Sequence, residues 1–307
     1  LGSQQKRIRK NINDRINAIL DHGKYIMGPE VFELEDNLAN YVSIKNCVSC
    51  SSGTDALLMP LLAKGIGKGD AVITTPFTYI ATAEVISLLG AVPIFSDIYP
   101  TTFNIDQDKI TESVHLAERK GLIPKAIIAV NLFGLPARYR LIKEVAKKHN
   151  LFIIEDAAQS FGSSKGIKKS GVLADVSSTS FFPAKPLGCY GDGGAIFTDD
   201  DDFAENLRSI RIHGSGSDKY DNVRVGINGR LDTIQAAILL EKLSIFDQEI
   251  KLRNQIADYY KTNLNKNFRT QIIPSGYLSS WAQFSILAET KNHREKIIQK
   301  MQSNNIP

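Results

Sequence analysis

Residues 175–194 read Asp-Val-Ser-Ser-Thr-Ser-Phe-Phe-Pro-Ala-Lys-Pro-Leu-Gly-Cys-Tyr-Gly-Asp-Gly-Gly, and this stretch decides how the chain folds. Its first half contains β-branched and aromatic side chains, among them Val176 and Phe181, which favour a strand. Pro183 and Pro186 then stop regular backbone hydrogen bonding on either side of Lys185. The four glycines that follow let the main chain pass close to a bulky group. The stretch therefore predicts a strand that runs into a rigid turn with Lys185 at its centre.

A lysine held in such a turn is a candidate amine nucleophile. Burial lowers the pKa of an ammonium group, and the neutral amine can then form an imine with a carbonyl carbon. The alternative is a solvated loop lysine, which is the commoner role because lysine is seldom buried. The remainder of the chain has to decide between these two roles for Lys185.

The composition is that of an ordinary globular enzyme. The 307 residues carry a net charge of +4, and no block of Lys and Arg is long enough for a nucleic-acid footprint. No apolar run reaches the roughly 18 residues that a membrane span needs, and the N-terminus shows no signal-peptide pattern. Three cysteines, an odd number, favour a reducing compartment. We therefore expect a cytoplasmic protein that binds neither nucleic acid nor a membrane.

Two of the cysteines, Cys47 and Cys50, form a lone C-x-x-C pair. No second pair is present to complete a zinc site. We therefore expect buried thiols in a strand and no metal site.

Apolar runs alternate with helical patterns along most of the chain. Helices are predicted at residues 4–21, 30–41, 80–89, 106–120 and 141–149, and strands at residues 47–51, 71–75, 92–96, 126–131, 151–154 and 195–198. This alternation, with strands that are apolar on both faces, predicts an α/β fold around a mostly parallel sheet. Ligands bind at the carboxyl ends of the strands in such a sheet. Polar residues at or just after the predicted strand ends are Thr54, Tyr79, Asp156, Gln159 and Ser180.

We expect a large domain over residues 1–245 and a smaller α+β domain over residues 246–307. Residues 213–221 are rich in Gly, Ser and Asp and predict a mobile loop, and residues 226–232 are expected to open a long helix through residue 243 and beyond. In the small domain, residues 281–287 predict a strand and residues 293–302 a helix. We expect the small domain to be truncated, because residues 306 and 307 stand where another strand is due.

Small polar residues at 52–54 precede the apolar helix that begins near Ala56. The free N–H groups and the dipole of a helix N-terminus favour a phosphate there, although an ordinary N-cap explains the same residues equally well. A P-loop ATPase is excluded, because the chain contains no G-x-x-x-x-G-K-[ST] motif.

Together these residues meet the requirements of pyridoxal 5′-phosphate. Lys185 would hold the aldehyde of the cofactor as an imine, and Asp156 would pair with the pyridine nitrogen and keep it protonated. Tyr79 would lie against the face of the ring. The phosphate would be held by the N–H groups of Gly53 and Thr54 and by the hydroxyl of Ser180.

At this point the chain resembles the DegT/DnrJ/StrS sugar-nucleotide aminotransferases, which have the aspartate-aminotransferase fold (fold type I). The resemblance implies a homodimer with active sites shared between the subunits. It further implies that Asn228 of the partner completes the phosphate site and that Gln159 lies near the ring hydroxyl of the cofactor. The residues that carry the resemblance are Gly28-Pro29-Glu30, Ser52-Gly53-Thr54-Asp55-Ala56-Leu57, Pro76-Phe77-Thr78-Tyr79-Ile80-Ala81-Thr82, Glu155-Asp156-Ala157-Ala158-Gln159-Ser160, Ser180-Phe181-Phe182-Pro183-Ala184-Lys185, Gly191-Asp192-Gly193-Gly194 and Gly226-x-Asn228-x-Arg230.

The activity that the resemblance implies is transfer of an amino group from L-glutamate to a keto sugar attached to a nucleoside diphosphate. Residues 211–214 and 229–240 look most like members that aminate position 3, acting on a UDP-linked 3-keto-2-acetamido sugar or uronate for bacterial O-antigen and surface polysaccharide. Arg230 would bind the uronate carboxylate or the diphosphate, and His213 would also contact substrate; an intersubunit salt bridge and an ordinary loop histidine are the alternatives. Amination at position 4 stays open. A regulator that binds pyridoxal phosphate without catalysis is the remaining alternative.

Overall fold

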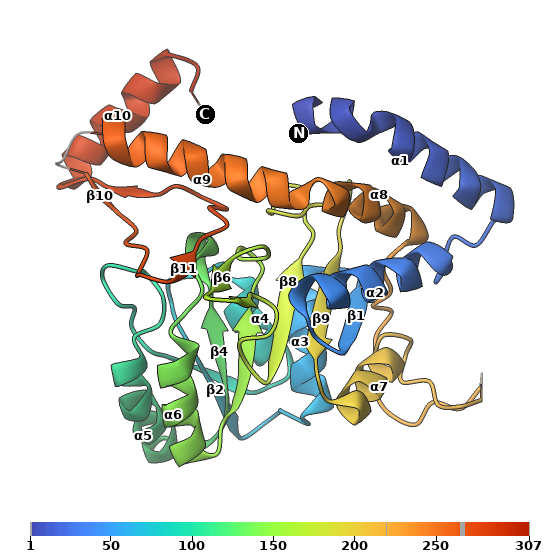
Figure 1. The fold of residues 1–307 in the computed structure, drawn as a ribbon. Helices are drawn as coiled ribbons and strands as arrows, with labels where there is room; N and C mark the ends of the chain where they lie inside the picture. Colours follow the sequence, from blue (N-terminus) through green and yellow to red (C-terminus); the bar gives the residue numbers. More distant parts are fainter. Residues whose placement is uncertain (1, 219, 265–267, 307) are drawn as a thin grey trace.

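The computed structural model describes residues 2–218, 220–264 and 268–306. At its centre lies a seven-stranded sheet with the strand order β1-β9-β8-β5-β4-β2-β3 (Figure 1). The strands of this sheet are β1 (Asn46–Cys50), β2 (Asp70–Thr74), β3 (Val92–Phe95), β4 (Ile123–Val130), β5 (Phe152–Asp156), β8 (Val176–Ser180) and β9 (Gly194–Thr198).

The expected α/β fold with a mostly parallel sheet is confirmed, with one exception. Strands β3, β2, β4, β5 and β8 pair in parallel, whereas β9 is antiparallel to both of its neighbours. Parallel strands need a crossover, usually through a helix, but the chain returns from β8 to β9 through the Lys185 turn alone. The short return forces β9 to run backwards, and Lys185 lies in the connection between two paired strands.

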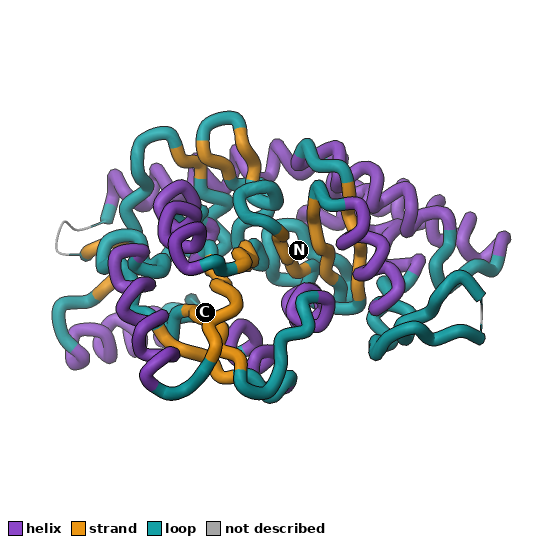
Figure 2. The backbone as a smooth tube through the Cα atoms, turned by 90° about the horizontal axis from the view of Figure 1, so that it is seen from below, coloured by secondary structure: helices purple, strands orange, loops and turns teal. Residues whose placement is uncertain are grey.

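Helices cover both faces of the sheet (Figures 1 and 2). On one face α3, α4 and α7 pack against side chains such as Ile128 and Ile154. On the other face α5 and α6 pack against Ile127 and Ile153, and α2 and α8 pack near β1 and β9. Successive residues of a strand point to opposite faces, which explains why the central strands carry apolar residues on both faces. The helices are α1 (Gly2–His22), α2 (Pro29–Val42), α3 (Gly53–Ala63), α4 (Ala81–Leu88), α5 (Ile110–Arg119), α6 (Tyr139–His149), α7 (Asp201–Ile210), α8 (Thr233–Ser244), α9 (Phe246–Asn263) and α10 (Lys291–Ser303).

The prediction that residues 226–232 open one long helix is wrong. This segment is extended, and Asp232 forms an isolated bridge with Ile26 before α8 begins at Thr233. The helix is interrupted at Ile245, whose backbone (φ −109°, ψ 2°) is not helical, and α9 begins at the next residue. Side-chain burial over residues 233–250 alone does not reveal this break, because both helices contribute to one apolar cluster.

The predicted strand at residues 281–287 is also wrong, since only β12 (Ile286–Leu287) is a strand there, paired with β10 (Arg269–Thr270). Trp281 has a left-handed backbone (φ 46°) that no strand residue adopts. The predicted helix at residues 293–302 is confirmed as α10. A three-stranded sheet, β7-β6-β11, is formed by Lys168–Lys169, Ser164–Lys165 and Tyr277–Leu278.

The expected domain boundary falls at Ile245, between α8 and α9, and the division into two domains stays a prediction. The expectations for the chain end at residue 307 and for residue 219 of the 213–221 loop lie outside the described residues. Cys47 and Cys50 are buried, unlinked thiols in β1, as expected. Within the described residues, none of the helices combines the length and apolar character needed to cross a membrane.

Candidate active site

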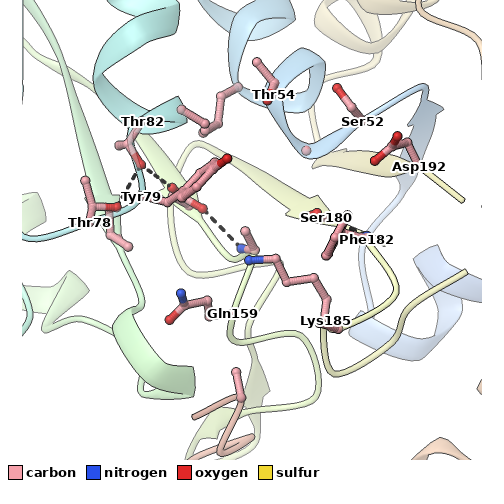
Figure 3. A pocket seen from close by; sticks show the side chains of 18 of the residues that line it. Ser52, Thr54, Thr78, Tyr79, Thr82, Gln159, Ser180, Phe182, Lys185 and Asp192 are labelled. Carbon is pink, nitrogen blue, oxygen red and sulfur yellow. Dashed lines mark hydrogen bonds between the residues drawn. The ribbon is translucent and has the colours of Figure 1, made fainter. Parts of the chain in front are cut away.

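A cavity of about 560 Å³ opens where the strand ends meet the Lys185 turn (Figure 3). Its walls come from the residues after β1, the loop between β2 and α4, the end of β5 and the end of β8. The parallel course of these strands brings their carboxyl ends to one edge, as the sequence suggested. Of the expected site residues, those that line the cavity are Gly53, Thr54, Tyr79, Asp156, Gln159, Ser180 and Lys185.

Asp156 is the last residue of β5 and is only 5% exposed. Its Oδ2 accepts a hydrogen bond from the Thr82 hydroxyl (2.9 Å), and its Oδ1 accepts one from the Ala158 N–H (3.2 Å). Burial raises the pKa of this carboxyl, while the Ala158 N–H, the Thr82 hydroxyl and the charge of Lys185 each act to lower it. The site therefore holds a carboxylate that needs a cationic or N–H partner within the cavity.

Lys185 lies in a loop whose neck is closed by backbone bonds. The N–H of Cys189 donates to the Phe181 carbonyl (2.7 Å), and the N–H of Lys185 donates to the Phe182 carbonyl (2.8 Å). The Lys185 side chain points into the cavity (Figure 3) and is half-buried. Burial lowers the pKa of its ammonium group, and the nearby Asp156 carboxylate partly opposes that effect. Lys185 thus has the neutral amine more available than a solvated lysine does.

The N-terminus of α3 forms a concave wall. Ser52 caps this helix by accepting a hydrogen bond from the Asp55 N–H (3.0 Å) on its Oγ. A Cβ placed on Gly53 would lie 2.5 Å from the Cβ of Ser180, so only glycine fits at this position. The first N–H groups of a helix have no acceptor inside the helix. With the Ser180 hydroxyl beside them, the N–H groups of Gly53 and Thr54 can bind an anion.

Tyr79 and Gln159 form further parts of the wall. Tyr79 is 69% exposed and its ring extends over the cavity (Figure 3). Gln159 Oε1 accepts a hydrogen bond from the Phe133 N–H (2.6 Å), and its backbone carbonyl accepts one from the Ser280 hydroxyl (2.7 Å). Those two bonds hold Gln159 between the sheet edge and residues 280–283, of which Gln283 also reaches the cavity.

Three expected site residues do not line the cavity of their own chain. Asn228 and His213 are exposed on a segment that projects from the sheet (Figures 1 and 2). This segment is held by an isolated bridge between Ile212 and Asn228 and by the His213 N–H, which donates to the Ile227 carbonyl (2.9 Å). Arg230 is half-buried, and its Nε has no hydrogen-bond partner within the described part of the chain.

Sequence reasoning assigned no role to Thr78 and Thr82, although both side chains line the cavity. The available signal was their spacing of four residues at the start of a helix, beside Tyr79. In the described ranges, no group of three or more His, Cys, Asp and Glu side chains is arranged to hold a metal ion.

Comparison with known proteins relates this geometry to a family. A family model described as the DegT/DnrJ/EryC1/StrS aminotransferase family matches residues 6–307. The UDP-2-acetamido-2-deoxy-3-oxo-D-glucuronate aminotransferase of Pseudomonas aeruginosa is 46% identical over 308 aligned residues, which cover 100% of this chain and 83% of that protein. A protein named pleiotropic regulatory protein from Geobacillus stearothermophilus is 42% identical over 260 residues, covering 85% and 68% of the two chains.

Solved structures show the same relationship. A DegT/DnrJ/EryC1/StrS aminotransferase from Brucella abortus superposes with a TM-score of 0.97 and 47% identity, covering 100% of this chain and 82% of that one. NtdA of Bacillus subtilis, solved with bound cofactor PMP, superposes with a TM-score of 0.88 and 31% identity, covering 96% and 66%. The chain therefore belongs to the DegT/DnrJ/EryC1/StrS aminotransferase family.

Proposed function

We propose that this sugar aminotransferase uses pyridoxal 5′-phosphate to move the amino group of L-glutamate to a nucleotide-linked 3-keto sugar. The observation that carries the proposal is the meeting of an amine, a buried carboxylate and an anion cradle in one cavity. Lys185, Asp156 and Gly53 supply these three groups from three separate parts of the chain. The Pseudomonas aeruginosa relative, which acts on a UDP-linked 3-oxo sugar by its name, supports position 3.

The residues present fit pyridoxal 5′-phosphate, whose relative PMP is bound in the Bacillus subtilis structure. The missing Cβ of Gly53 lets the Ser180 side chain lie directly against the N-terminus of α3, where its hydroxyl and the first N–H groups of the helix could bind the phosphate, and the α3 dipole favours the charge of that group. Asp156 would accept a hydrogen bond from the ring nitrogen, and Lys185 would bind the aldehyde carbon. Tyr79 would cover the ring, with Gln159 near the ring hydroxyl.

When bound, the cofactor withdraws electrons from the substrate carbon that carries the nitrogen. Each residue then has a separate task. Asp156, as a carboxylate, keeps a proton on the ring nitrogen. Lys185 is the amine that, when free within the cavity, would remove a proton from one carbon and return it to another. Its lowered pKa suits this task, because a general base must be unprotonated before it acts.

The substrate assignment rests on the segment that contains His213 and Arg230. An arginine offers a planar fork of donors that fits a carboxylate or a diphosphate, and the Arg230 Nε is buried without a partner in the described chain. We propose a UDP-linked 3-keto-2-acetamido sugar or uronate as the amino acceptor, His213 as a further substrate contact, and synthesis of O-antigen or surface polysaccharide in the cytoplasm as the role.

We further propose a homodimer in which this segment crosses to the partner. Asn228 is exposed and lies outside its own cavity, yet an amide is well suited to bind a phosphate. In a dimer with shared sites, Asn228 of one subunit would complete the phosphate site of the other. A 3-keto sugar remains preferred over a 4-keto sugar as the substrate.

A regulator that binds the cofactor without turnover is the second candidate, because the Geobacillus stearothermophilus relative carries a regulatory name. The test is a half-reaction. Protein loaded with pyridoxal phosphate is mixed with L-glutamate while the visible absorption of the cofactor and the release of 2-oxoglutarate are recorded. The enzyme loses that absorption and releases one 2-oxoglutarate per site; a regulator does neither.

UDP-linked and dTDP-linked 3-keto and 4-keto sugars are then offered to the aminated protein. Return of the cofactor absorption identifies the acceptor, and we expect the UDP-linked 3-keto sugar to act fastest. Lys185→Ala serves as the control: it should bind the cofactor without a covalent bond and give no turnover. Full activity of Lys185→Ala would refute the assignment.

A further inference from the structure

We propose that Thr82 and Thr78 form a directed pair of hydroxyls that positions Asp156 and keeps it an ionised acceptor for the ring nitrogen of the cofactor. This inference rests on the proposed function of the cavity. It assigns positioning roles to Thr82, which contacts Asp156 directly, and to Thr78, which contacts Asp156 through the Thr82 hydroxyl.

The geometry of the pair is compact. Thr82 is in the first turn of α4 and is 1% exposed, and its Oγ1 lies 2.9 Å from Asp156 Oδ2. Thr78 precedes the helix, and its Oγ1 lies 2.9 Å from the Oγ1 of Thr82. Figure 3 shows the two hydroxyls in line along one wall of the cavity. The spacing of four residues places them next to each other at the start of the helix.

Counting protons gives the pair a direction. A threonine hydroxyl has a single proton to donate, and an ionised carboxylate can only accept. Thr82 therefore donates its proton to Asp156, and its oxygen is left to accept the proton of Thr78. A chain of this kind polarises toward the carboxylate, because each bond strengthens the next.

Asp156 needs this support because of its surroundings. It is buried, and burial raises the pKa of a carboxyl, which favours the neutral acid. The opposing groups are the Ala158 N–H of its own loop, the Thr82 hydroxyl of α4 and the ammonium of Lys185. The phenol of Tyr139, on α6, also interacts with Asp156, and its own pKa is raised by burial and by the neighbouring carboxylates.

In the loaded protein the Lys185 nitrogen would be bonded to the aldehyde carbon of the cofactor and would no longer be a free ammonium group. Asp156 then depends on the Ala158 N–H, on Thr82 and on the ring nitrogen itself. The Ala158 bond is longer than the Thr82 bond, 3.2 against 2.9 Å. Among the described residues, Thr82 and the Ala158 N–H are thus the two protein donors to the Asp156 carboxylate, and Thr82 is the one that a side-chain substitution can remove.

The test compares Thr82→Val, which keeps the shape and removes the hydroxyl, with Thr82→Ser, which keeps the hydroxyl. Thr78→Val removes only the second hydroxyl. Thr74→Val is the matched control, because Thr74 is buried and donates to the Ile128 carbonyl (3.0 Å) outside the cavity. Two quantities are measured: the dissociation constant of pyridoxal phosphate, and the pH at which the ring nitrogen of ¹⁵N-labelled cofactor loses its proton, followed by NMR.

For Thr82→Val we expect about tenfold weaker cofactor binding and deprotonation of the ring nitrogen about one pH unit higher, the size of one hydrogen bond to a charged group. The direction follows because Asp156 without the Thr82 hydroxyl is the stronger base and holds the proton of the ring nitrogen more tightly. Thr82→Ser should match the wild type, Thr78→Val should show a smaller shift in the same direction, and Thr74→Val none. A ring nitrogen that titrates identically in Thr82→Val and the wild type overturns the inference. So does a Thr82→Ser variant as impaired as Thr82→Val, since packing would then explain both.

If Thr82→Val does not fold, Thr78→Val decides the outcome, because an unchanged titration there contradicts the directed pair. Failure of the proposed function looks different. In that case the wild-type protein itself binds no pyridoxal phosphate, whereas failure of this inference leaves a loaded wild type and unaffected threonine variants.

Discussion

Replacing Arg211 by methionine should destabilise the protein more than replacing Arg208, a half-buried arginine in the last turn of α7 whose ion-pair partner is exposed. Arg211 follows α7 and is 3% exposed, and its Nη1 lies 2.5 Å from the Oε1 of Glu35, which is 7% exposed on α2. The same Nη1 donates to the Ser49 carbonyl (2.9 Å), and the Ser49 N–H and hydroxyl both donate to Glu35 (2.8 and 2.6 Å). These three residues tie α2, β1 and the end of α7 together.

The size of the effect follows from what the substitution leaves behind. Removing one partner of a buried ion pair costs about 3–5 kcal/mol, because the remaining charge stays buried without its counter-ion. The entropy of unfolding is roughly 2.1 cal/mol/K per residue, or about 0.6 kcal/mol/K for a chain of this length. The melting temperature of Arg211→Met should therefore fall by about 5–8 °C.

The matched control is Arg208→Met, one turn earlier in the chain. Arg208 pairs with Glu205, whose side chain is exposed, and such surface pairs contribute about 0–1 kcal/mol. Thermal unfolding of cofactor-free protein at pH 7, followed by circular dichroism, should thus show a shift of at most about 2 °C for the control.

A double substitution separates charge from packing. When Glu35→Gln is combined with Arg211→Met, no charge is left in the cluster, because the amide introduced at position 35 is neutral in the interior. The double variant should melt at or above the temperature of Arg211→Met alone. Equal melting of Arg211→Met and Arg208→Met, or strictly additive losses in the double variant, would show that the buried charge is not what matters.

Three further predictions concern the cavity and its support. The melting temperature of Gly134→Ala should lie well below that of Gly121→Ala. Both glycines have a positive φ, but of the two only Gly134 has another segment beside it, because a Cβ there would lie 2.5 Å from the Ser280 Oγ. Equal melting temperatures of the two variants would contradict this reasoning. Gly53→Ala should weaken binding of pyridoxal phosphate about tenfold or more, and that of phosphate-free pyridoxal much less, in equilibrium dialysis; equal losses would exclude a phosphate cradle at this position. The rate at which the protein binds pyridoxal phosphate should rise with pH as Lys185 loses its proton, and stopped-flow absorbance measures this rate. The midpoint of the rise should lie below pH 10.5, because burial lowers the pKa of Lys185. A midpoint at or above pH 10.5 would count against a desolvated amine.

The sequence predicted most of the fold because its signals were local. Apolar strands, helix periods and the prolines around Lys185 act over a few residues, and the polar residues at the strand ends indicated which edge would hold the cavity. Asp156 and Lys185 are 29 positions apart in the sequence, yet the strand pairing of β5 with β8 brings them to one cavity.

The features that were missed depend on tertiary structure. Strand β9 runs antiparallel to β8 because the Lys185 loop connects the two strands directly. Residue propensities for strand or helix carry no information about the direction in which a strand pairs. Trp281 adopts a positive φ, which is rare for aromatic residues. Nothing in the sequence indicated this backbone conformation, so residues 281–287 were predicted to form a strand. Thr82 looked like an ordinary helix residue, and only the placement of α4 beside β5 makes it a partner of Asp156.

The role of the segment that contains Asn228 and Arg230 could not be derived from the structure of a single chain. Its residues suggested a role at an active site, and they lie outside the cavity of their own subunit. If the proposed homodimer shares its sites, the residues that line one cavity do not include the whole site. Cross-linking or mass measurement of the native protein tests the proposed homodimer.

The most direct test of the account is to identify the amine that carries the cofactor. Protein loaded with pyridoxal phosphate is reduced with borohydride, digested and mapped by mass spectrometry. The account predicts one modified residue, Lys185, with no label in protein treated without cofactor. A label on another lysine, or none at all in protein that has bound the cofactor, would contradict it.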